Sequence, residues 1–226
     1  MAAGHGSRVV SNAINYMIRE PACKKCRRAG QKLFLKEERC FTAKCAMIKK
    51  PYAPGLRAKK RRSTLSEYGS QLAEKQKVKR IYGINEKQLR RYFAEALKSK
   101  GVVTDVLVDK LETRLDNIIF RLGITGSRTK ARQIVSHGHI LLNGRKVNIP
   151  SISVRKGDII EINKSSTKKV LFKELEAKLK KYKMPSWLSS EIKENNEFKA
   201  VVLNVPERSE IEIPADLAMI VEFYSR

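Results

Sequence analysis

The chain has 226 residues, of which 42% are hydrophobic, and this apolar content excludes a mainly disordered protein. Lys and Arg number 48 against 23 Asp and Glu, and the net charge of +25 favours a polyanionic partner, most often nucleic acid. No apolar run of transmembrane length and no signal-peptide core occurs, so the sequence predicts a cytosolic protein that binds no membrane.

The four cysteines of the chain fall into two close pairs, Cys23 with Cys26 and Cys40 with Cys45. The spacing C-x2-C-x13-C-x4-C is typical of a tetrahedral zinc site with four thiolate ligands. Basic residues flank both pairs, which favours a module that lies against an anion. Four buried, reduced thiols are the alternative. We expect one structural Zn²⁺ bound by all four cysteines.

A basic arm follows the cysteines. Residues 39–66 contain no Asp or Glu, and Pro51, Pro54 and Gly55 keep this stretch irregular. A solvated, solubilising charge run is the alternative to a phosphate-binding arm. The cations of the arm that we expect to contact RNA are Arg57, Lys59, Lys60, Arg61 and Arg62.

Two helices are predicted after the arm, the first capped by Ser66 and the second by Asn85, and each is followed by a glycine. Leu89, Phe93 and Leu97 recur every four residues and form the buried stripe of the second helix. The cations of both helices are expected to face mostly outward and to contact RNA. They are Lys75, Lys77, Lys79, Arg80, Arg90 and Arg91.

A third helix is predicted over residues 107–122, where apolar residues recur at helical spacing. Beyond the module described next, residues 164–183 predict a lysine-rich helix that leads to Trp187. Residues 218–224 resemble a strand in composition and are expected to pack against protein. Trp187 and Phe198 are expected in the core, with base-stacking platforms as the alternative.

Between these segments, Ser127 caps a short helix and Gly138 ends it. The turn at Asn143-Gly144 predicts a type I′ hairpin, and residues 153–162 supply a further strand. Arg128 and Arg132 are one helical turn apart and away from the apolar side, so they could bridge successive phosphates. The residues of this region that we expect to contact RNA are Arg114, Arg121, Arg128, Lys130, Arg132, Gln133, His137, His139, Asn143, Arg145 and Lys146.

The two neighbouring imidazoles, His137 and His139, also allow a metal site or acid–base chemistry as an interpretation. No carboxylate or cysteine lies near them in the sequence to complete either kind of site. RNA contact or hydrogen bonding at the helix end is therefore the favoured hypothesis for both.

Residues 114–162 closely resemble the RNA-binding module named after small-subunit ribosomal protein four, which several unrelated RNA enzymes share. The segments KLFLKEERCFTAKCAMIKKPYAPG, LSEYGSQLAEKQKVKRIYGINEKQLRRYF and IVEFYSR look like the remaining parts of the bacterial form of that ribosomal protein family. The resemblance covers residues 22–226. Residues 1–20 are longer than the short N-terminal segment expected in this family and differ from it in sequence. The arm sequence LRAKKRR replaces a usual Gln-His-Gly run, so contacts of that motif do not carry over.

The resemblance implies an α+β fold with two parts. Residues 1–111 and 198–226 would form a helical N-terminal domain with the zinc module and the basic arm, closed by the C-terminal segment. Residues 112–197 would form the RNA-binding module, two helices on a small sheet with the α-L type motif, together with a trailing helix.

The resemblance also implies a structural constituent of the small ribosomal subunit. Such a protein binds 16S-type rRNA at a helix junction in the 5′ domain and nucleates assembly of the subunit body. Ribosomal protein five of the small subunit and mRNA, at the channel through which it enters, are implied partners, with an effect on translational accuracy. A ribosome-bound, cytoplasmic protein without a small-molecule substrate is expected.

Two other functions are alternatives to a ribosomal protein. The sequence Arg114-Leu115-Asp116 resembles a motif of rRNA pseudouridine synthases, some of which carry the same module. Here Asp116 opens the module, and the chain after Ile162 is too short for a catalytic domain, which needs roughly 100 residues or more. We therefore expect no enzyme, and Asp116 is interpreted as a structural acid paired with an arginine. A free RNA-binding translational regulator remains the alternative.

Overall fold

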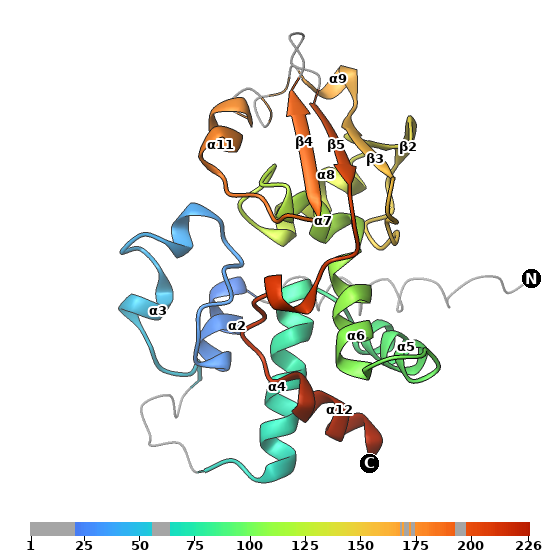
Figure 1. Ribbon diagram of the computed structural model, residues 1–226. Coiled ribbons are helices and arrows are strands. Elements are labelled where there is room, and N and C mark those ends of the chain that lie inside the picture. Colours follow the sequence, from blue (N-terminus) through green and yellow to red (C-terminus); the bar gives the residue numbers. More distant parts are fainter. Residues whose placement is uncertain (1–20, 56–63, 168, 170–171, 173–174, 193–197) are drawn as a thin grey trace, which may run out of the picture.

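The computed structural model describes residues 21–55, 64–167, 169, 172, 175–192 and 198–226. These residues build two hydrophobic cores. One lies among helices of the N-terminal part and the C-terminal helix, and the other lies between a sheet and the helices beside it. In Figure 1 the sheet occupies the upper end of the molecule and the helical part the lower end. The α+β class predicted from the sequence is confirmed.

The cysteine-containing region consists of short helices joined by loops. These are α2 (Ala22–Ala29), the 3₁₀ turn η1 (Glu38–Cys40) and α3 (Ala46–Lys49). In Figure 1 they lie beside the long helix α4 (Glu67–Tyr82), and Cys26 and Leu33 belong to the helical core.

The caps predicted for the next two helices are confirmed. The Ser66 hydroxyl accepts a hydrogen bond from the Gly69 amide at the start of α4, and the Asn85 side chain accepts one from the Gln88 amide at 2.7 Å at the start of α5 (Glu86–Leu97). The predicted stripe of α5 is wrong at its last residue, Leu97, which is 57% exposed, and Ala96 is buried in its place.

The single helix predicted over residues 107–122 is wrong. Helix α6 (Val103–Glu112) ends before Arg114, and α7 (Leu115–Arg121) begins after it. The loop before β3 accounts for the break, because the amides of Leu115 and Asp116 donate to the carbonyl oxygens of Ile152 at 2.9 Å and Pro150 at 3.1 Å. These amides therefore bond to a distant segment, a partner that helical spacing does not reveal.

Residues 128–147 form the predicted helix and hairpin. Helix α8 (Arg128–Ser136) is capped by Ser127. Asn143 and Gly144 both have positive φ, 50° and 75°, as a type I′ turn requires. The antiparallel sheet has the order β2-β1-β3-β5-β4. Its strands are β1 (Ile140–Leu142), β2 (Arg145–Val147), β3 (Ile159–Ile162), β4 (Leu188–Ile192) and β5 (Phe198–Val202).

The lysine-rich segment contains α9 (Lys164–Thr167) and α11 (Leu175–Lys181), and part of the helix predicted over 164–183 lies outside the described residues. Trp187 and Phe198 are buried in the core around the sheet, as predicted. The closing segment was expected to begin at residue 198, but β5 pairs with β3 and β4. The chain returns to the helical part only after this strand.

After η2 (Arg208–Glu210), the strand predicted over residues 218–224 is wrong, because the structure has helix α12 (Leu217–Ser225) there. The Asp216 side chain caps it by accepting from the Ala218 amide at 2.9 Å. Leu217 and Ile220, three residues apart, enter the helical core. Over the part of the chain described, no helix has the length and apolar character needed to cross a membrane.

Candidate nucleic-acid interface

Two of the arginines predicted to contact RNA bind the same buried carboxylate. Arg114 is 1% exposed and donates to the Asp116 carboxylate at 3.0 and 2.9 Å and to the Tyr92 hydroxyl at 2.8 Å. Arg132 donates to the same carboxylate at 3.1 Å and to the Gly83 carbonyl oxygen. Asp116 is thus a structural acid paired with arginine, as predicted. Arg114 has almost no exposed surface with which to meet a phosphate.

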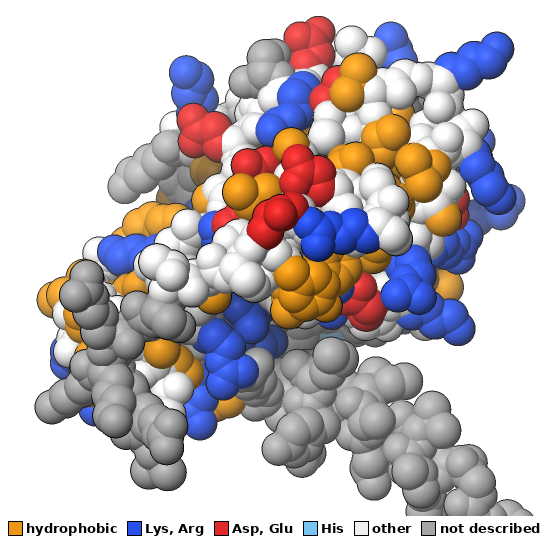
Figure 2. All heavy atoms as spheres, turned by 90° about the horizontal axis from the view of Figure 1, so that it is seen from below, with side chains coloured by type: hydrophobic (Ala, Val, Ile, Leu, Met, Phe, Trp, Pro, Cys, Tyr) orange, Lys and Arg blue, Asp and Glu red, His pale blue; other side chains and the backbone are white. Residues whose placement is uncertain are grey.

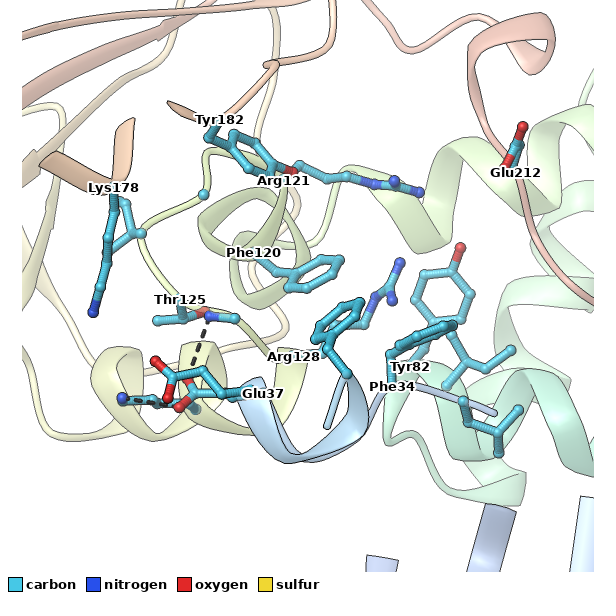
Figure 3. A pocket seen from close by; sticks show the side chains of 18 of the residues that line it. Phe34, Glu37, Tyr82, Phe120, Arg121, Thr125, Arg128, Lys178, Tyr182 and Glu212 are labelled. Carbon is cyan, nitrogen blue, oxygen red and sulfur yellow. Dashed lines mark hydrogen bonds and ion pairs between the residues drawn. The ribbon is translucent and has the colours of Figure 1, made fainter. Parts of the chain in front are cut away.

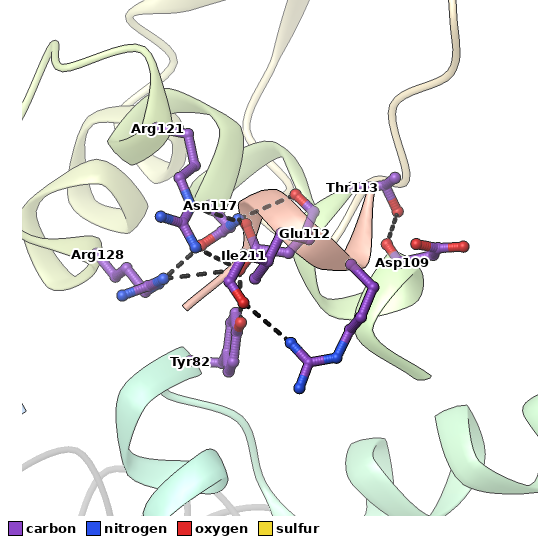
Figure 4. Close-up of polar contacts among 9 residues, drawn as sticks. Tyr82, Asp109, Glu112, Thr113, Asn117, Arg121, Arg128 and Ile211 are labelled. Atoms are coloured by element: carbon purple, nitrogen blue, oxygen red, sulfur yellow. Dashed lines mark hydrogen bonds and ion pairs between the residues drawn. The ribbon is translucent and has the colours of Figure 1, made fainter. Parts of the chain in front are cut away.

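A second buried carboxylate, that of Glu112, gathers side chains from three helices (Figure 4). It accepts hydrogen bonds from the Tyr82 hydroxyl at 2.5 Å, from Asn117 at 2.7 Å and from Arg121 at 2.8 and 2.9 Å. The Arg128 guanidinium lies 3.8 Å away. Two arginines therefore share one carboxylate at the end of α6, where the helical part meets the sheet module.

Arg128 is held more tightly than the sequence suggests. Its Nε donates to the Asn117 side chain at 2.7 Å, and its guanidinium lies 4.8 Å from the ring centroid of Tyr82 and 4.4 Å from that of Phe120. The prediction that Arg128 and Arg132 are exposed cations on a free helix face is wrong. Both side chains join elements of the fold, because acids and rings from other helices surround them.

The pKa shifts agree with this packing. Burial by itself would raise the pKa of Glu112, but hydrogen bonds and charge from Arg121, with Arg128 nearby, outweigh it and lower the pKa. Burial lowers the pKa of Arg128, since the attraction of Tyr82 and Glu112 only partly offsets the loss of solvent. The site is thus a desolvated ion cluster with one more positive than negative charge.

The lysines of α4 also differ from the prediction that they face mostly outward. Lys75 and Lys79 are buried and donate to Glu86 at 2.9 and 2.8 Å. The Lys75 ammonium lies 3.9 Å from the ring centroid of Phe223 on α12. Burial would raise the pKa of Glu86, but hydrogen bonds, first from Lys79 and then from Lys75, lower it to about 2.

Several other residues that were predicted to contact RNA pair with acidic side chains of the same chain. Lys77 pairs with Glu74 at 2.5 Å. Arg91 pairs with Glu95 at 2.8 Å but stays exposed. Lys130 is half-buried and pairs with Glu37 at 3.2 Å, Arg80 is half-buried, and Arg90 is exposed. Asn143 is exposed, yet its amide donates to the Asp158 carboxylate at 2.8 Å and so stabilises the hairpin turn.

A basic cluster forms where α8, β1, β2 and the end of α9 meet. We use this name for His137, His139, Arg145, Lys146 and Lys169. The imidazole centroids of His137 and His139 are 5.9 Å apart, and His139 Nε2 lies 3.5 Å from the Lys169 ammonium. Burial, and then the charges of Lys169, His137 and Lys146, lower the pKa of His139. The Lys146 side chain lies against Gly138, so the cluster is continuous.

The members of this cluster differ in exposure. His137, Arg145 and Lys146 are exposed, whereas His139 is buried and its Nδ1 is hydrogen-bonded to Ser166 at 2.9 Å. Gln133, also exposed, lies one turn before His137 on α8. Lys169 was missed by the sequence analysis because it is thirty residues from His139.

The four cysteines are free thiols, with Cys26, Cys40 and Cys45 buried and Cys23 half-buried. Burial, and then the neighbouring thiols of Cys40, Cys23 and Cys45, raise the pKa of Cys26. The backbone amide of Lys36 donates to the Cys40 sulfur at 3.3 Å. Among the described residues, no three His, Cys, Asp or Glu side chains are arranged closely enough to hold a metal ion.

The arm residues Arg57, Lys59, Lys60, Arg61 and Arg62 lie outside the described residues. Elsewhere the charge is unevenly distributed. On the face that Figure 2 shows, acidic side chains gather near the centre, and Lys and Arg lie mostly towards the margins. Several of the arginines and lysines predicted to contact RNA are bound to carboxylates within the fold.

Two family models match the chain. Residues 17–112 match the ribosomal protein S4/S9 N-terminal domain, and residues 113–160 match the S4 domain. The boundary falls after Glu112, at the break between α6 and α7.

Similar proteins include small ribosomal subunit protein uS4 of Halothermothrix orenii, 51% identical over 206 residues, and that of Natranaerobius thermophilus, 48% identical over 206 residues. Each match covers 91% of this chain and 97% of the relative. The protein of the same name from Thermus thermophilus is 46% identical over 207 residues, again covering 91% and 97%. These relatives are ribosomal proteins, which confirms the expectation that the chain is not an enzyme. With a match of this extent, the chain belongs to the family of small ribosomal subunit protein uS4.

Proposed function

We propose that this protein is a structural constituent of the small ribosomal subunit that binds 16S-type rRNA, in the cytoplasm. The observation that carries the proposal is the basic cluster, in which β2, the segment between α8 and β1, and Lys169 after α9 bring basic side chains together at the S4 domain. Family membership supports the ribosomal assignment over a free translational regulator.

Binding would proceed through phosphates. Lys and Arg that neutralise phosphates release condensed counterions, so affinity falls steeply with salt, by about 10³–10⁵ between 50 and 200 mM for roughly 6–10 contacts. The A-form major groove is too narrow for side chains to read. Specificity would therefore come from the shape of a folded junction, which a rigid cationic surface can match.

The test removes charge from this surface without disturbing the fold. Arg145→Gln, Lys146→Gln and Lys169→Gln together should weaken binding to a folded 5′-domain transcript and flatten its salt dependence by about one unit of slope per lost contact. Filter binding at several salt concentrations measures both. The matched control neutralises three exposed lysines on and after α5, Lys87, Lys98 and Lys100.

Equal affinity of the wild-type protein for folded and unstructured RNA of the same length would contradict specific rRNA binding. The same result for the cluster variant and the control variant would show that only total charge matters.

We also propose that the four cysteines bind one structural Zn²⁺. The spacing of the four cysteines in two close pairs and the amide bonded to the Cys40 sulfur support the assignment. Zinc bonding would supply folding energy to a region with short helices. Elemental analysis should find about one zinc per chain, lost with disorder of residues 20–50 when Cys23→Ala and Cys40→Ala are combined. Wild-type protein that is folded and free of metal would refute the proposal.

The resemblance to the family is the ground for a finer role. We propose that the protein nucleates assembly of the subunit body at a junction of the 5′ domain. We further propose that it contacts ribosomal protein five and lies beside the channel through which mRNA enters, where it affects accuracy. Co-sedimentation with subunits, followed by crosslinking mapped to nucleotides and proteins, tests each contact. Recovery only in the free pool would favour the regulator.

A further inference from the structure

A cavity of about 770 Å³ lies between the cysteine-containing region and the S4 domain (Figure 3). Its walls include the rings of Phe34, Phe41, Phe120 and Tyr182. Phe34 is 43% exposed and Phe41 is 73% exposed, and their ring centroids are 5.3 Å apart in a stacked arrangement. Exposed aromatic rings beside a cavity are a common mark of a binding surface.

The bottom of the cavity is the sandwich in which Arg128 lies between Tyr82 and Phe120. Arg121 also lines the cavity, and both arginines share the buried Glu112. Both faces of the Arg128 guanidinium are thus covered, and the exposed rings of Phe34 and Phe41 are left as the groups on which an unpaired base could stack.

The loop that carries the rings has an unusual backbone. Among the described non-glycine residues, positive φ occurs at Phe34 (50°), Glu37 (26°) and Asn143 (50°), and the first two line this cavity. Glu37 fastens the loop to the S4 domain, because it accepts from the Gly126 amide at 3.3 Å and pairs with Lys130 at 3.2 Å. Backbone of this kind costs free energy and tends to persist at functional sites.

The walls of the cavity have charges of both signs. Figure 3 shows Lys178 at one end and Glu212 at the other, with the rings between them. Glu37 and Lys130 line the cavity as an ion pair, and Glu38 lines it as well. The amino groups on a base edge can donate to a carboxylate, so these walls are compatible with a base. A base, with its apolar faces and polar edges, matches them better than an apolar or uniformly basic protein segment does.

We propose that this cavity receives one unpaired base of the bound RNA, stacked against Phe34 and Phe41. The proposal rests on the RNA binding proposed above and assigns part of it to the junction between the two parts of the molecule. The surface proposed above binds phosphates, and the cavity would add a contact with an extruded base.

The first test replaces both rings with an aliphatic side chain, Phe34→Leu with Phe41→Leu. Loss of base stacking should weaken binding to a folded 5′-domain transcript by roughly 5- to 150-fold, while the salt slope stays the same because no cation is removed. Phe34→Trp with Phe41→Trp should keep tight binding, since the stacking surface is retained. Tyr68→Leu, at a 52% exposed ring on α4 outside the cavity, should leave the affinity unchanged.

The second test locates the base directly. Ultraviolet crosslinking of the wild-type complex and tryptic digestion should give an RNA adduct on the peptide of residues 33–36, LFLK, which contains Phe34 and no cysteine. The double leucine variant should lose this adduct. Far-ultraviolet dichroism and the thermal midpoint confirm that each variant is folded.

The outcomes separate the two proposals. Wild-type binding to the folded transcript, with no adduct on this peptide and equal affinity of the leucine variant, overturns the cavity assignment and leaves rRNA binding intact. A leucine variant that binds RNA normally but joins subunits poorly would indicate a protein occupant and also overturns it. Wild-type protein that does not prefer folded RNA defeats rRNA recognition and the cavity assignment together.

Discussion

Several side chains at the junction between the helical part and the sheet module bind the carboxylate of Glu112. It is fully buried, and every hydrogen bond it accepts comes from a different element than its own helix α6. A buried carboxylate without partners would be costly, so Arg121 and Arg128 are needed to keep it charged. Substitutions among these residues therefore act on stability before they act on RNA.

For Arg128→Ala we expect a loss of about 1–3 kcal/mol in unfolding free energy, because Asn117 loses its donor and the space between Tyr82 and Phe120 empties. Chemical denaturation measures the change. Gln133→Ala, at an exposed position of the same helix, should stay within about 0.5 kcal/mol of the wild-type protein. If the unfolding free energies of both variants equal that of the wild-type protein, Arg128 contributes nothing to the stability of the fold.

Sequence patterns could find the cations but not their partners. Arg128 and Gln133 both lie off the apolar stripe of α8, and only the position of α7 and Tyr82 decides that the first is enclosed. Asp116 was correctly interpreted because its arginine is two residues away. Lys169 could not be found, since the fold brings it to His139 from a distant segment.

At the scale of elements, helix α12 shows how tertiary packing overrides a local preference. Residues 218–224 contain aromatic and β-branched side chains that favour a strand. The Asp216 cap and the burial of Leu217 and Ile220 against the helical core make a helix the better solution. By contrast, α4, α5 and α8 were predictable, because each has a capping residue at its start and a glycine beyond its end in the sequence.

The contacts of α4, α5 and α12 at Glu86 predict a dependence on pH. The pKa of Glu86 is lowered to about 2 from an ordinary 4.5, so its contribution is complete above about pH 4.5 and is lost as the pH falls towards 2. The thermal midpoint of Glu86→Gln should lie below that of the wild-type protein at pH 7, and the difference should shrink towards pH 2. Glu207→Gln, at an exposed carboxylate, is the comparison.

At the scale of the molecule, the two cores meet at few places. The helical core depends on α12, which packs on α4, whereas the sheet core contains no residue beyond Val202. Along the sequence, most of the helical part therefore comes first and the sheet module second, and α12 then completes the helical part. The resemblance to a known family indicated this order, although it placed the start of the closing segment at residue 198 and so assigned β5 to the wrong part.

A chain that stops after residue 206 should separate the two cores. It lacks Ile211, Leu217 and Ile220, so we expect α4 to α6 to lose hydrogen-exchange protection while the five strands keep theirs. Uniform loss of protection over both parts would show that the molecule unfolds as one unit. Unchanged protection in α4 would show that α12 is dispensable.

The position of α12 near the C-terminus also sets the order in which the parts of the molecule can fold during synthesis. Helix α4 is synthesised more than a hundred residues before the segment that covers it, so its apolar side waits uncovered while the whole sheet module is made. The sheet module, whose strands follow one another closely, can close earlier. In a nascent chain of this protein, the N-terminal helical part is therefore the part most exposed to aggregation or to chaperones. This exposure ends when residues 211–220 have left the ribosome and pack on the helical core.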